Sequence, residues 1–540
     1  MRIRCWTCAA LMFVLLAACR IAAEETAVPT IAGLATVPSA SPTHTPTLPD
    51  PAPSPTSTAG ITEPKESLPA PTLFDVSWSD RRPFRSGLVE EEQAVLEALP
   101  GATVYHLNFQ IAESLTAITG EQEVRYTNQE SVPLEAVYFH LFPNLLGGSL
   151  TVKRVTVNGE SLGTPGLTGN ALLLRVPLPE PLLPGDQVVI GLNFETRVPA
   201  ESGRNYGVFS LLDDILALAH FYPMVAVYDD NGWDTDTPST EGDVVYADAS
   251  FYLVGVTAPA AQTLAGGGVE IGREQNDRQQ TITYALGPAR DFYLAASDRY
   301  DVVSQTIDGV TVRSYAPKEL RDGAETAVDI ARNALRSFSG RFGPYPYTEL
   351  DIVATPTLAL GIEYSGIIVA NINIFNLNGS VGGQPTAHFL ESTTAHEVGH
   401  QWFYSMVGND QLDEPWLDES LTQYVTWTYY LDRYGKSEAE EILQSFSNRW
   451  NRLEDREIPI GLPVQAYHGN EYGAIVYGRG PLFFLAMEDA MGEKAFDAFL
   501  RDYTTRFKWG IATGVALKQL AEAHCACDLT PLFEEWVYAP

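Results

Sequence analysis

Residues 396–400 read HEVGH, and Glu419 follows their second histidine after a further eighteen residues. If the segment is helical, histidines four residues apart lie on one face about one turn apart, so two imidazoles can bind one metal ion. Two imidazoles and a carboxylate are a protein ligand set for zinc that leaves the fourth tetrahedral position open for water. We therefore predict one Zn²⁺ per chain, bound by His396, His400 and Glu419, in a hydrolase.

The surroundings of this motif favour a metal site over an exposed polar helix. Residues 390–407 carry apolar side chains on several sides, which predicts a largely buried helix in which unpaired histidines would be costly. A second helix is predicted from residue 416 to about residue 430, with Glu419 in its first turn. The connection between the helices is short, so Glu419 can reach the metal. Glu397, between the two histidines, is the candidate general base.

Composition bounds the class of protein. A chain of 540 residues is too long for one compact core, so we predict two or more domains. It has 34 Lys and Arg against 68 Asp and Glu, a net charge of −34, which disfavours a nucleic-acid-binding role because a phosphate backbone would be repelled. Of the five cysteines, only Cys525 and Cys527 lie outside the first 19 residues. They predict either a local disulfide or two buried thiols, and we assign them no function.

The N-terminus resembles an export signal. Arg2 and Arg4 precede an apolar run that is too short to span a bilayer, and Leu-Ala-Ala-Cys at residues 16–19 resembles a bacterial lipobox. We predict a signal peptide over residues 1–19 and a lipid anchor on Cys19, which would place the protein outside the cytoplasm on the cell membrane. The alternative is ordinary cleavage near Ala23.

Three further regions follow the signal. Residues 20–72 are rich in Pro, Ser and Thr and predict a disordered linker. Residues 73–305 hold short alternating and β-branched runs separated by turn residues, which predicts a mostly antiparallel β domain. Residues 306–540 are mainly of helical periodicity and contain the candidate metal site. The predicted fold class is therefore α+β with several domains.

Three motifs in order resemble one family. They are LGIEY at residues 360–364, HEVGH, and WLDE at residues 416–419. Together they resemble the gluzincin zinc aminopeptidases, which include the membrane alanyl aminopeptidase and leukotriene hydrolase. The resemblance covers residues 103–540. It implies a saddle-like β domain followed by a thermolysin-like catalytic domain, without the long C-terminal helical region of larger members.

The first motif implies how a substrate would be held. In the family it usually reads Gly-x-Met-Glu-Asn, and its glutamate binds the substrate's free α-ammonium group. Glu363 matches this glutamate, and Gly361 is assigned to the same substrate-binding segment, whereas Leu360, Ile362 and Tyr364 depart from the usual residues. A carboxylate beside the metal would hold the first peptide bond over the zinc, so the predicted substrates are peptides with a free N-terminus.

The resemblance also implies a tyrosine that donates a hydrogen bond to the developing oxyanion. Tyr477 fits that position, and Tyr472 lies where a second active-site tyrosine is found. The predicted function is thus a zinc aminopeptidase in which Glu397 is the base and Tyr477 the oxyanion donor. Two alternatives stay open: a zinc hydrolase of another specificity, such as an endopeptidase or an epoxide or ester hydrolase, and a tethered binding protein with a vestigial site.

Overall fold

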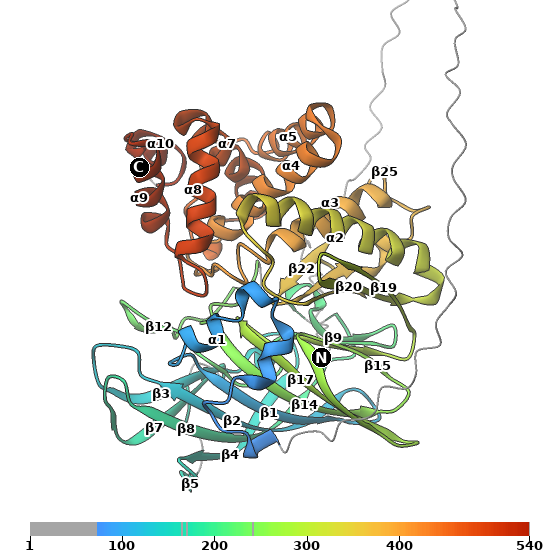
Figure 1. Cartoon of the computed structure of the whole chain (residues 1–540), viewed down its shortest axis with the longest axis vertical. Coiled ribbons are helices and arrows are strands. Elements are labelled where there is room, and N and C mark those ends of the chain that lie inside the picture. The colour runs from blue at the N-terminus through green and yellow to red at the C-terminus, as the bar shows by residue number, and fades with distance from the viewer. Residues whose placement is uncertain (1–72, 164–165, 169–170, 203, 240–241, 539–540) are drawn as a thin grey trace, which may run out of the picture.

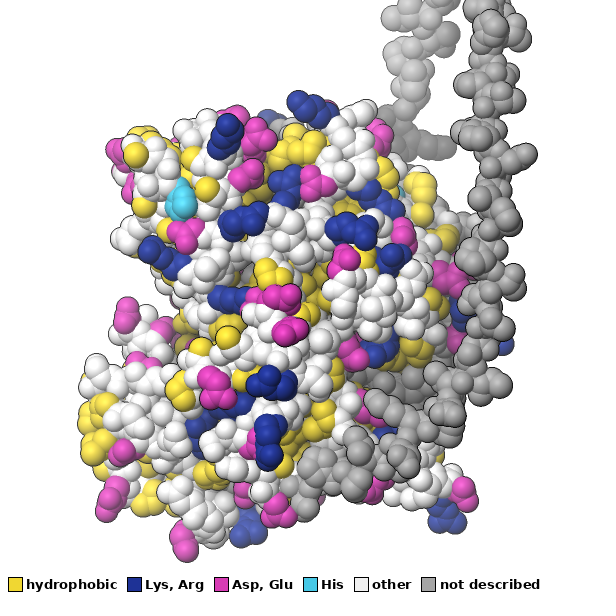
Figure 2. Space-filling view, in the orientation of Figure 1, with side chains coloured by type: hydrophobic (Ala, Val, Ile, Leu, Met, Phe, Trp, Pro, Cys, Tyr) yellow, Lys and Arg dark blue, Asp and Glu magenta, His cyan; other side chains and the backbone are white. Residues whose placement is uncertain are grey.

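The computed structural model describes residues 73–163, 166–168, 171–202, 204–239 and 242–538. The predicted signal peptide, Cys19 and the linker over residues 20–72 lie outside this part of the chain and stay predictions. Among the described helices, none has the length and apolar character needed to cross a membrane. Figure 2 shows acidic side chains scattered over one face of the molecule and mixed with Lys and Arg. On this face the acidic side chains are interspersed with basic ones and are not gathered in a single negative patch.

The N-terminal half, here called the β domain, is built on an eight-stranded sheet (Figure 1). Short helical turns precede it, among them η2 (Arg82–Gly87) and α1 (Val95–Ala98). The strand order is β16 (Val269–Gln275), β17 (Gln279–Ala289), β14 (Ser250–Pro259), β1 (Val104–Ile111), β2 (Ala117–Thr127), β8 (Gln187–Arg197), β4 (Ser149–Val157) and β5 (Glu160–Ser161). Neighbours are antiparallel except for the parallel pair β1 and β14. Every second residue of β8 is buried, as alternation predicts for a sheet with one face on the core.

Two four-stranded sheets complete the β domain. The first has the order β15 (Thr263–Gly266), β18 (Leu294–Ser297), β10 (Ile215–Leu218) and β9 (Phe209–Leu212). The second has the order β11 (Met224–Val225), β3 (Leu134–His140), β7 (Leu173–Leu182) and β6 (Gly166–Thr168). A small hairpin, β12 (Tyr228–Asp229) and β13 (Gly232–Trp233), lies between β11 and β14 in the sequence. The predicted β character of this half is confirmed.

The C-terminal half, here called the catalytic domain after its predicted role, opens with a five-stranded sheet. Its order is β19 (Tyr300–Ile307), β20 (Val310–Pro317), β21 (Glu349–Thr355), β23 (Ile367–Asn371) and β22 (Gly361–Tyr364). The helix α2 (Arg321–Phe342) connects the parallel strands β20 and β21. The short strand β22 runs antiparallel to β23 at one edge of the sheet. The predicted domain boundary between residues 305 and 306 falls within β19.

Helices make up most of the rest of the catalytic domain, beside the small hairpin β24 (Ser380–Val381) and β25 (Gln384–Pro385), and they lie above the β domain in Figure 1. They are α3 (Thr386–Gly399), the π-helical turn η8 (Trp416–Ser420) that leads into α4 (Leu421–Tyr434), α5 (Lys436–Trp450), α6 (Glu471–Ala474), the π-helical turn η10 (Ile475–Arg479), α7 (Gly480–Met491), α8 (Glu493–Arg506), α9 (Gly514–Cys525) and α10 (Thr530–Trp536). The predicted α+β class, with a β domain before a mainly helical catalytic domain, is confirmed.

One predicted helix is too long. The helix expected over residues 390–407 ends at Gly399, and the chain continues in turns. Beyond Gly399 the N–H groups of Ser405, Met406 and Val407 donate to carbonyls five residues back, so the α-helical hydrogen-bond pattern is lost. Arg290 of the β domain holds this loop, because its guanidinium donates to the carbonyls of Tyr404, Ser405 and Met406 at 3.1 to 3.2 Å.

Arg290 and Asp291 join the two domains. Arg290 is fully buried and also donates to the carbonyls of Ala247, in the β domain, and Gly510, in the catalytic domain, at 3.2 and 2.6 Å. Asp291 accepts a hydrogen bond from the Tyr404 hydroxyl at 2.7 Å. A buried arginine is stable only where its N–H groups have acceptors. Arg290 and the five carbonyls that it contacts, here called the Arg290 clamp, therefore fix the loop after α3 against both domains.

The two C-terminal cysteines form a disulfide. Cys525 ends α9, and its bond to Cys527 encloses a single residue, Ala526, which has φ of 51°. Of the two arrangements left open by the sequence, the structure therefore contains the local disulfide.

Candidate active site

His396 and His400 lie one turn apart at the end of α3, and both are buried. Gly399 between them lets α3 approach α4, because a Cβ at this position would come within 2.8 Å of the Thr422 side chain. The two Nε2 atoms face each other at 3.1 Å. The helical spacing thus brings both imidazoles to one point, as the sequence predicts.

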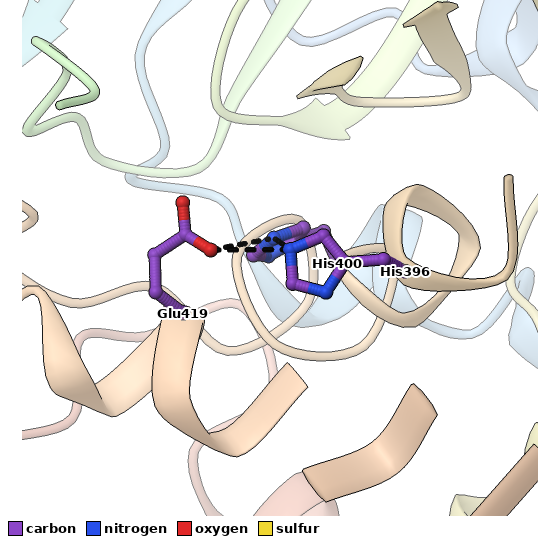
Figure 3. Close-up of side chains that lie close together, drawn as sticks. All are labelled: His396, His400 and Glu419. Atoms are coloured by element: carbon purple, nitrogen blue, oxygen red, sulfur yellow. Dashed lines mark hydrogen bonds and ion pairs between the residues drawn. The ribbon is translucent and has the colours of Figure 1, made fainter. Parts of the chain in front are cut away.

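Glu419 completes a three-ligand group from the neighbouring turn η8 (Figure 3). Its Oε2 lies 3.1 Å from His396 Nε2 and 3.5 Å from His400 Nε2. Ligands bound to one tetrahedral zinc ion at about 2.0 to 2.1 Å are separated from one another by about 3.3 Å. The three donor atoms therefore fit zinc in both chemistry and spacing, and the predicted Zn²⁺ site is supported by its geometry.

The second ring nitrogens of the histidines have partners that orient the rings. His400 Nδ1 lies 3.0 Å from the carbonyl oxygen of Phe403. That contact requires a proton on Nδ1 and leaves the lone pair of Nε2 free for a metal. His396 Nδ1 lies 3.3 Å from the hydroxyl of Thr426 on α4.

The charges of the group suit a cation. Burial opposes ionisation of Glu419, but hydrogen bonds from His396 and His400 hold its pKa well below the usual value. Burial lowers the pKa of His396 and so favours the neutral imidazole that a metal needs. Burial would lower the pKa of His400 too, but the charges of Glu363 and Glu419 outweigh it and raise that pKa. The negative charges of these carboxylates favour a positive charge beside His400, and a bound metal ion would supply it.

Glu397 lies on α3 beside the metal ligands. It is buried, and its Oε2 has no hydrogen-bond partner among the described residues. Burial raises the pKa of Glu397 well above the usual value, in the direction a general base requires. Gly361, the first residue of β22, lies directly against this side chain, because a Cβ on Gly361 would clash with the Glu397 carboxylate. The absent side chain at position 361 therefore makes room for the candidate base.

Glu363 reaches the same site from β22 and is buried. One of its carboxylate oxygens, a ring nitrogen of His400 and a carboxylate oxygen of Asp418 all lie within 4.8 Å of one another. Glu363 Oε1 accepts a hydrogen bond from Gln411 Nε2 at 2.9 Å. Burial raises the pKa of Glu363 to about 7. The structure thus places this carboxylate beside the metal ligands, where the resemblance implies an amine-binding group.

One of the two predicted tyrosines contacts the Glu419 oxygen that does not face the histidines, and the other packs beside it. Tyr477, in η10, donates its hydroxyl to Glu419 Oε1, and its ring centroid lies 5.7 Å from that of Tyr472. Burial raises the pKa of both phenols well above the usual value, so both remain hydrogen-bond donors at neutral pH. All eight residues predicted for the site are therefore close together in the structure.

Three acidic or amide side chains of the site escape prediction from the sequence. Gln411 lies in the loop between α3 and η8, and Asp418 is the residue before Glu419. Asp243 comes from the β domain; burial, followed by the charges of Glu363 and Glu419, raises its pKa well above the usual value. Asp418 stands within the WLDE motif and could have been noticed there, whereas no spacing connects Asp243 or Gln411 with the metal ligands.

Comparison with known families accounts for this arrangement. Residues 326–536, which contain all three predicted metal ligands, match the model of the peptidase family M1 domain. Over these residues the chain is similar to that domain. The predicted resemblance to gluzincin zinc aminopeptidases is thereby confirmed. Aminopeptidase 2 of Candida albicans is 26% identical over 267 residues, which cover 48% of this chain and 29% of that protein. Aminopeptidase N of Lactococcus lactis is 25% identical over 248 residues, which cover 44% of this chain and 29% of that protein. The aligned segment is thus less than a third of either relative.

Solved structures share the two-domain fold of this chain. An M1 zinc metallopeptidase from Deinococcus radiodurans superimposes with a TM-score of 0.61 at 19% identity, over 81% of this chain and 95% of that one. The agreement extends through both domains and confirms the predicted architecture.

Proposed function

We propose that this protein is a zinc-dependent aminopeptidase that removes the first residue from peptides with a free N-terminus. The proposal is carried by the position of Glu363, a buried carboxylate with an oxygen within 4.8 Å of a nitrogen of His400. A carboxylate this close to a metal ligand can bind an α-ammonium group while the adjoining peptide bond lies at the metal. The aminopeptidase names of the relatives support it, as does a Deinococcus radiodurans mutant metallopeptidase solved with a Tyr-Ser-Ala substrate.

The site residues supply the rest of the chemistry. A bound zinc ion lowers the pKa of water toward about 7 and polarises a carbonyl group. Glu397 takes the proton of the attacking water and gives it to the leaving amine. Tyr477, which donates to Glu419 in this structure, is the donor for the developing oxyanion, a contribution of about 3 to 4 kcal/mol in comparable enzymes. Glu363 holds the substrate's N-terminus throughout.

The competing zinc hydrolases fit this site less well. An endopeptidase would place a neutral peptide segment against Glu363 and leave that buried carboxylate without a cation. An epoxide or ester substrate has no need of an amine anchor. A vestigial binding protein would have no use for the complete set of ligands, base and tyrosine that lies together here.

The test compares free and blocked substrates. The purified protein is analysed for zinc and assayed with an aminoacyl fluorogenic amide and with its N-acetyl form. We expect about one zinc per chain and at least about a hundredfold preference for the free amine, because a charge-assisted pair contributes about 1.5 to 3 kcal/mol and its loss strands a buried charge. The preference should collapse in Glu363→Gln. Equal cleavage of the two substrates would contradict the proposed aminopeptidase activity and favour an endopeptidase.

An exported, tethered location belongs to the same proposal. It is supported by the basic start, the short apolar run and the lipobox-like residues before Cys19, with a linker after them. The full chain should fractionate with membranes, whereas Cys19→Ala should be released in soluble form. Retention of Cys19→Ala on the membrane would exclude a lipid anchor at this residue.

A further inference from the structure

Gln411 joins two carboxylates of the site. Its Nε2 donates to Glu363 Oε1 at 2.9 Å and to Asp418 Oδ2 at 2.7 Å, and all three side chains are at least 95% buried. Its Oε1 has no hydrogen-bond partner among the described residues. The amide orientation follows from these contacts, because the reversed amide would turn its oxygen toward two carboxylates.

The connection continues to the metal-ligand segment. Asp418 Oδ1 accepts the backbone N–H of Glu419 at 2.8 Å. One unbroken chain of hydrogen bonds therefore runs from the Glu363 carboxylate through Gln411 and Asp418 to the backbone of Glu419. Glu363 lies on the edge strand β22 and Glu419 on the turn η8, so the chain ties two separate elements together.

We infer that Gln411 and Asp418 are positioning residues that fix the amine-binding carboxylate relative to the metal, and so determine that cleavage occurs one residue from the N-terminus. The inference rests on the proposed role of Glu363. A substrate's α-nitrogen and its first scissile carbonyl are separated by a fixed covalent distance, and an error of about 1 Å in such an anchor is costly to the reaction. A carboxylate on a four-residue edge strand needs a partner to hold it to that accuracy.

Glutamine suits this place because it is a neutral donor. Its two amide protons satisfy both neighbouring carboxylates without adding charge to a site that already holds Glu363, Asp418 and Glu419. Methionine has a similar volume and no donor, so Gln411→Met removes the bridge and leaves the packing nearly unchanged.

The experiment uses the full zinc-loaded chain and two hydroxamate ligands that differ only in the α-amine. They are leucine hydroxamate and 4-methylpentanoyl hydroxamate, and calorimetric titration gives the affinity of each. The ratio of the two affinities reports on the amine anchor, whereas the des-amino ligand reports on the metal. We expect Gln411→Met to lower the ratio by about tenfold or more, with zinc content and des-amino affinity unchanged. Turnover should show a raised KM for the free-amine substrate.

Two further variants complete the design. Gln122→Met is the matched control, because Gln122 is a buried glutamine of the β domain whose Nε2 donates to the Pro223 carbonyl at 2.9 Å, and it should keep the ratio. Asp418→Asn breaks the far end of the bridge, since one oxygen cannot serve both donors, and should lower the ratio even if Gln411→Met fails to fold.

The outcomes separate the two proposals. If Glu363→Gln lowers the ratio but Gln411→Met and Asp418→Asn keep it, the positioning role is overturned and the aminopeptidase stands. If Gln411→Met weakens both ligands equally, Gln411 acts on the metal or on folding, and the inference fails. If Glu363→Gln itself keeps the ratio, the proposed aminopeptidase fails first.

Discussion

Glu397 offers the most direct prediction for a single residue. Glu397→Gln keeps the shape of the side chain but cannot accept a proton, so we expect kcat to fall by about 10²-fold to 10⁴-fold while zinc content stays the same. His396→Ala should lose zinc and activity together. Elemental analysis and steady-state kinetics on the same preparations check both results. Full turnover in Glu397→Gln would remove Glu397 from the mechanism.

Gly361 gives a second residue-scale prediction. A Cβ at this position would clash with the Glu397 carboxylate, so Gly361→Ala should displace the base and reduce kcat by at least about tenfold, with folding and zinc binding retained. Gly340→Ala is the matched control, because a Cβ at Gly340, on α2, meets nothing within 4 Å. In a helix, that substitution should raise the free energy of unfolding by up to about 1 kcal/mol. Unchanged kinetics in Gly361→Ala would contradict the close packing.

The grouping of the candidate metal ligands was predictable from the sequence because helical geometry alone brings residues four apart together. His396, His400 and Glu397 share one helix, and a short connection brings in Glu419. Gln411 has no such relation to its partners. It meets Glu363, 48 residues earlier in the chain, only after the sheet and the helices have packed. Contacts that depend on tertiary packing leave no periodic signal in the sequence.

At the scale of elements, β21 carries a buried acid whose titration should be measurable. Burial raises the pKa of Asp351 to about 7, although Arg313 opposes the rise. The native state then binds this proton more tightly than the unfolded chain, so Asp351 destabilises the fold progressively as the pH rises from about 4 to 7. Asp351→Asn removes the titrating carboxyl and with it this pH-dependent destabilisation. Denaturant unfolding at pH 5 and pH 8 should show the variant gaining stability relative to wild type as the pH rises, by about 2 to 3 kcal/mol between these two pH values. A pH-independent difference would contradict the shift.

The end of α3 shows a kind of interaction that the prediction of secondary structure from local sequence misses. The apolar pattern over residues 390–407 is helical, yet the helix stops at Gly399, and Arg290 holds the loop that follows through the carbonyls of Tyr404, Ser405 and Met406. That side chain is 114 residues away from Tyr404 in the sequence. Local periodicity describes what a segment favours on its own, and it contains no sign of a buried guanidinium from another domain that holds the segment.

The Arg290 clamp leads to a prediction for the same element. Arg290→Ala leaves several buried carbonyls without donors, so we expect the free energy of unfolding to fall by about 3 kcal/mol or more and zinc to dissociate faster. Arg336→Ala is the control, because the Arg336 side chain is 61% exposed and its ion pair with Asp308 is long, at 3.8 Å between Nε and Oδ2. Its loss should change the free energy of unfolding by less than about 1 kcal/mol. Chemical denaturation and zinc release to a chelator measure the two effects. Wild-type zinc release from Arg290→Ala would confine the clamp to a role in stability.

For the whole molecule, zinc and folding should be linked. A ligand that binds only the native state at a hundred times its Kd stabilises the fold by about 2.7 kcal/mol. Removal of zinc should therefore lower the unfolding midpoint, and added Zn²⁺ should restore it. Mg²⁺ should not, because it prefers oxygen ligands and this site offers two imidazoles. Equal rescue by Mg²⁺ would contradict the assigned ligand set.

The Arg290 clamp also bears on the order in which the molecule is completed. Domains of a nascent chain generally fold from the N-terminus, so the β domain with Arg290 forms before the loop it will hold has been synthesised. One of its acceptors, the Gly510 carbonyl, lies 220 residues after Arg290. The loop behind the metal-binding helix is therefore secured only when almost the whole catalytic domain has been made. We therefore expect the metal site to be completed late in the folding of each new chain, against a β domain that is already folded.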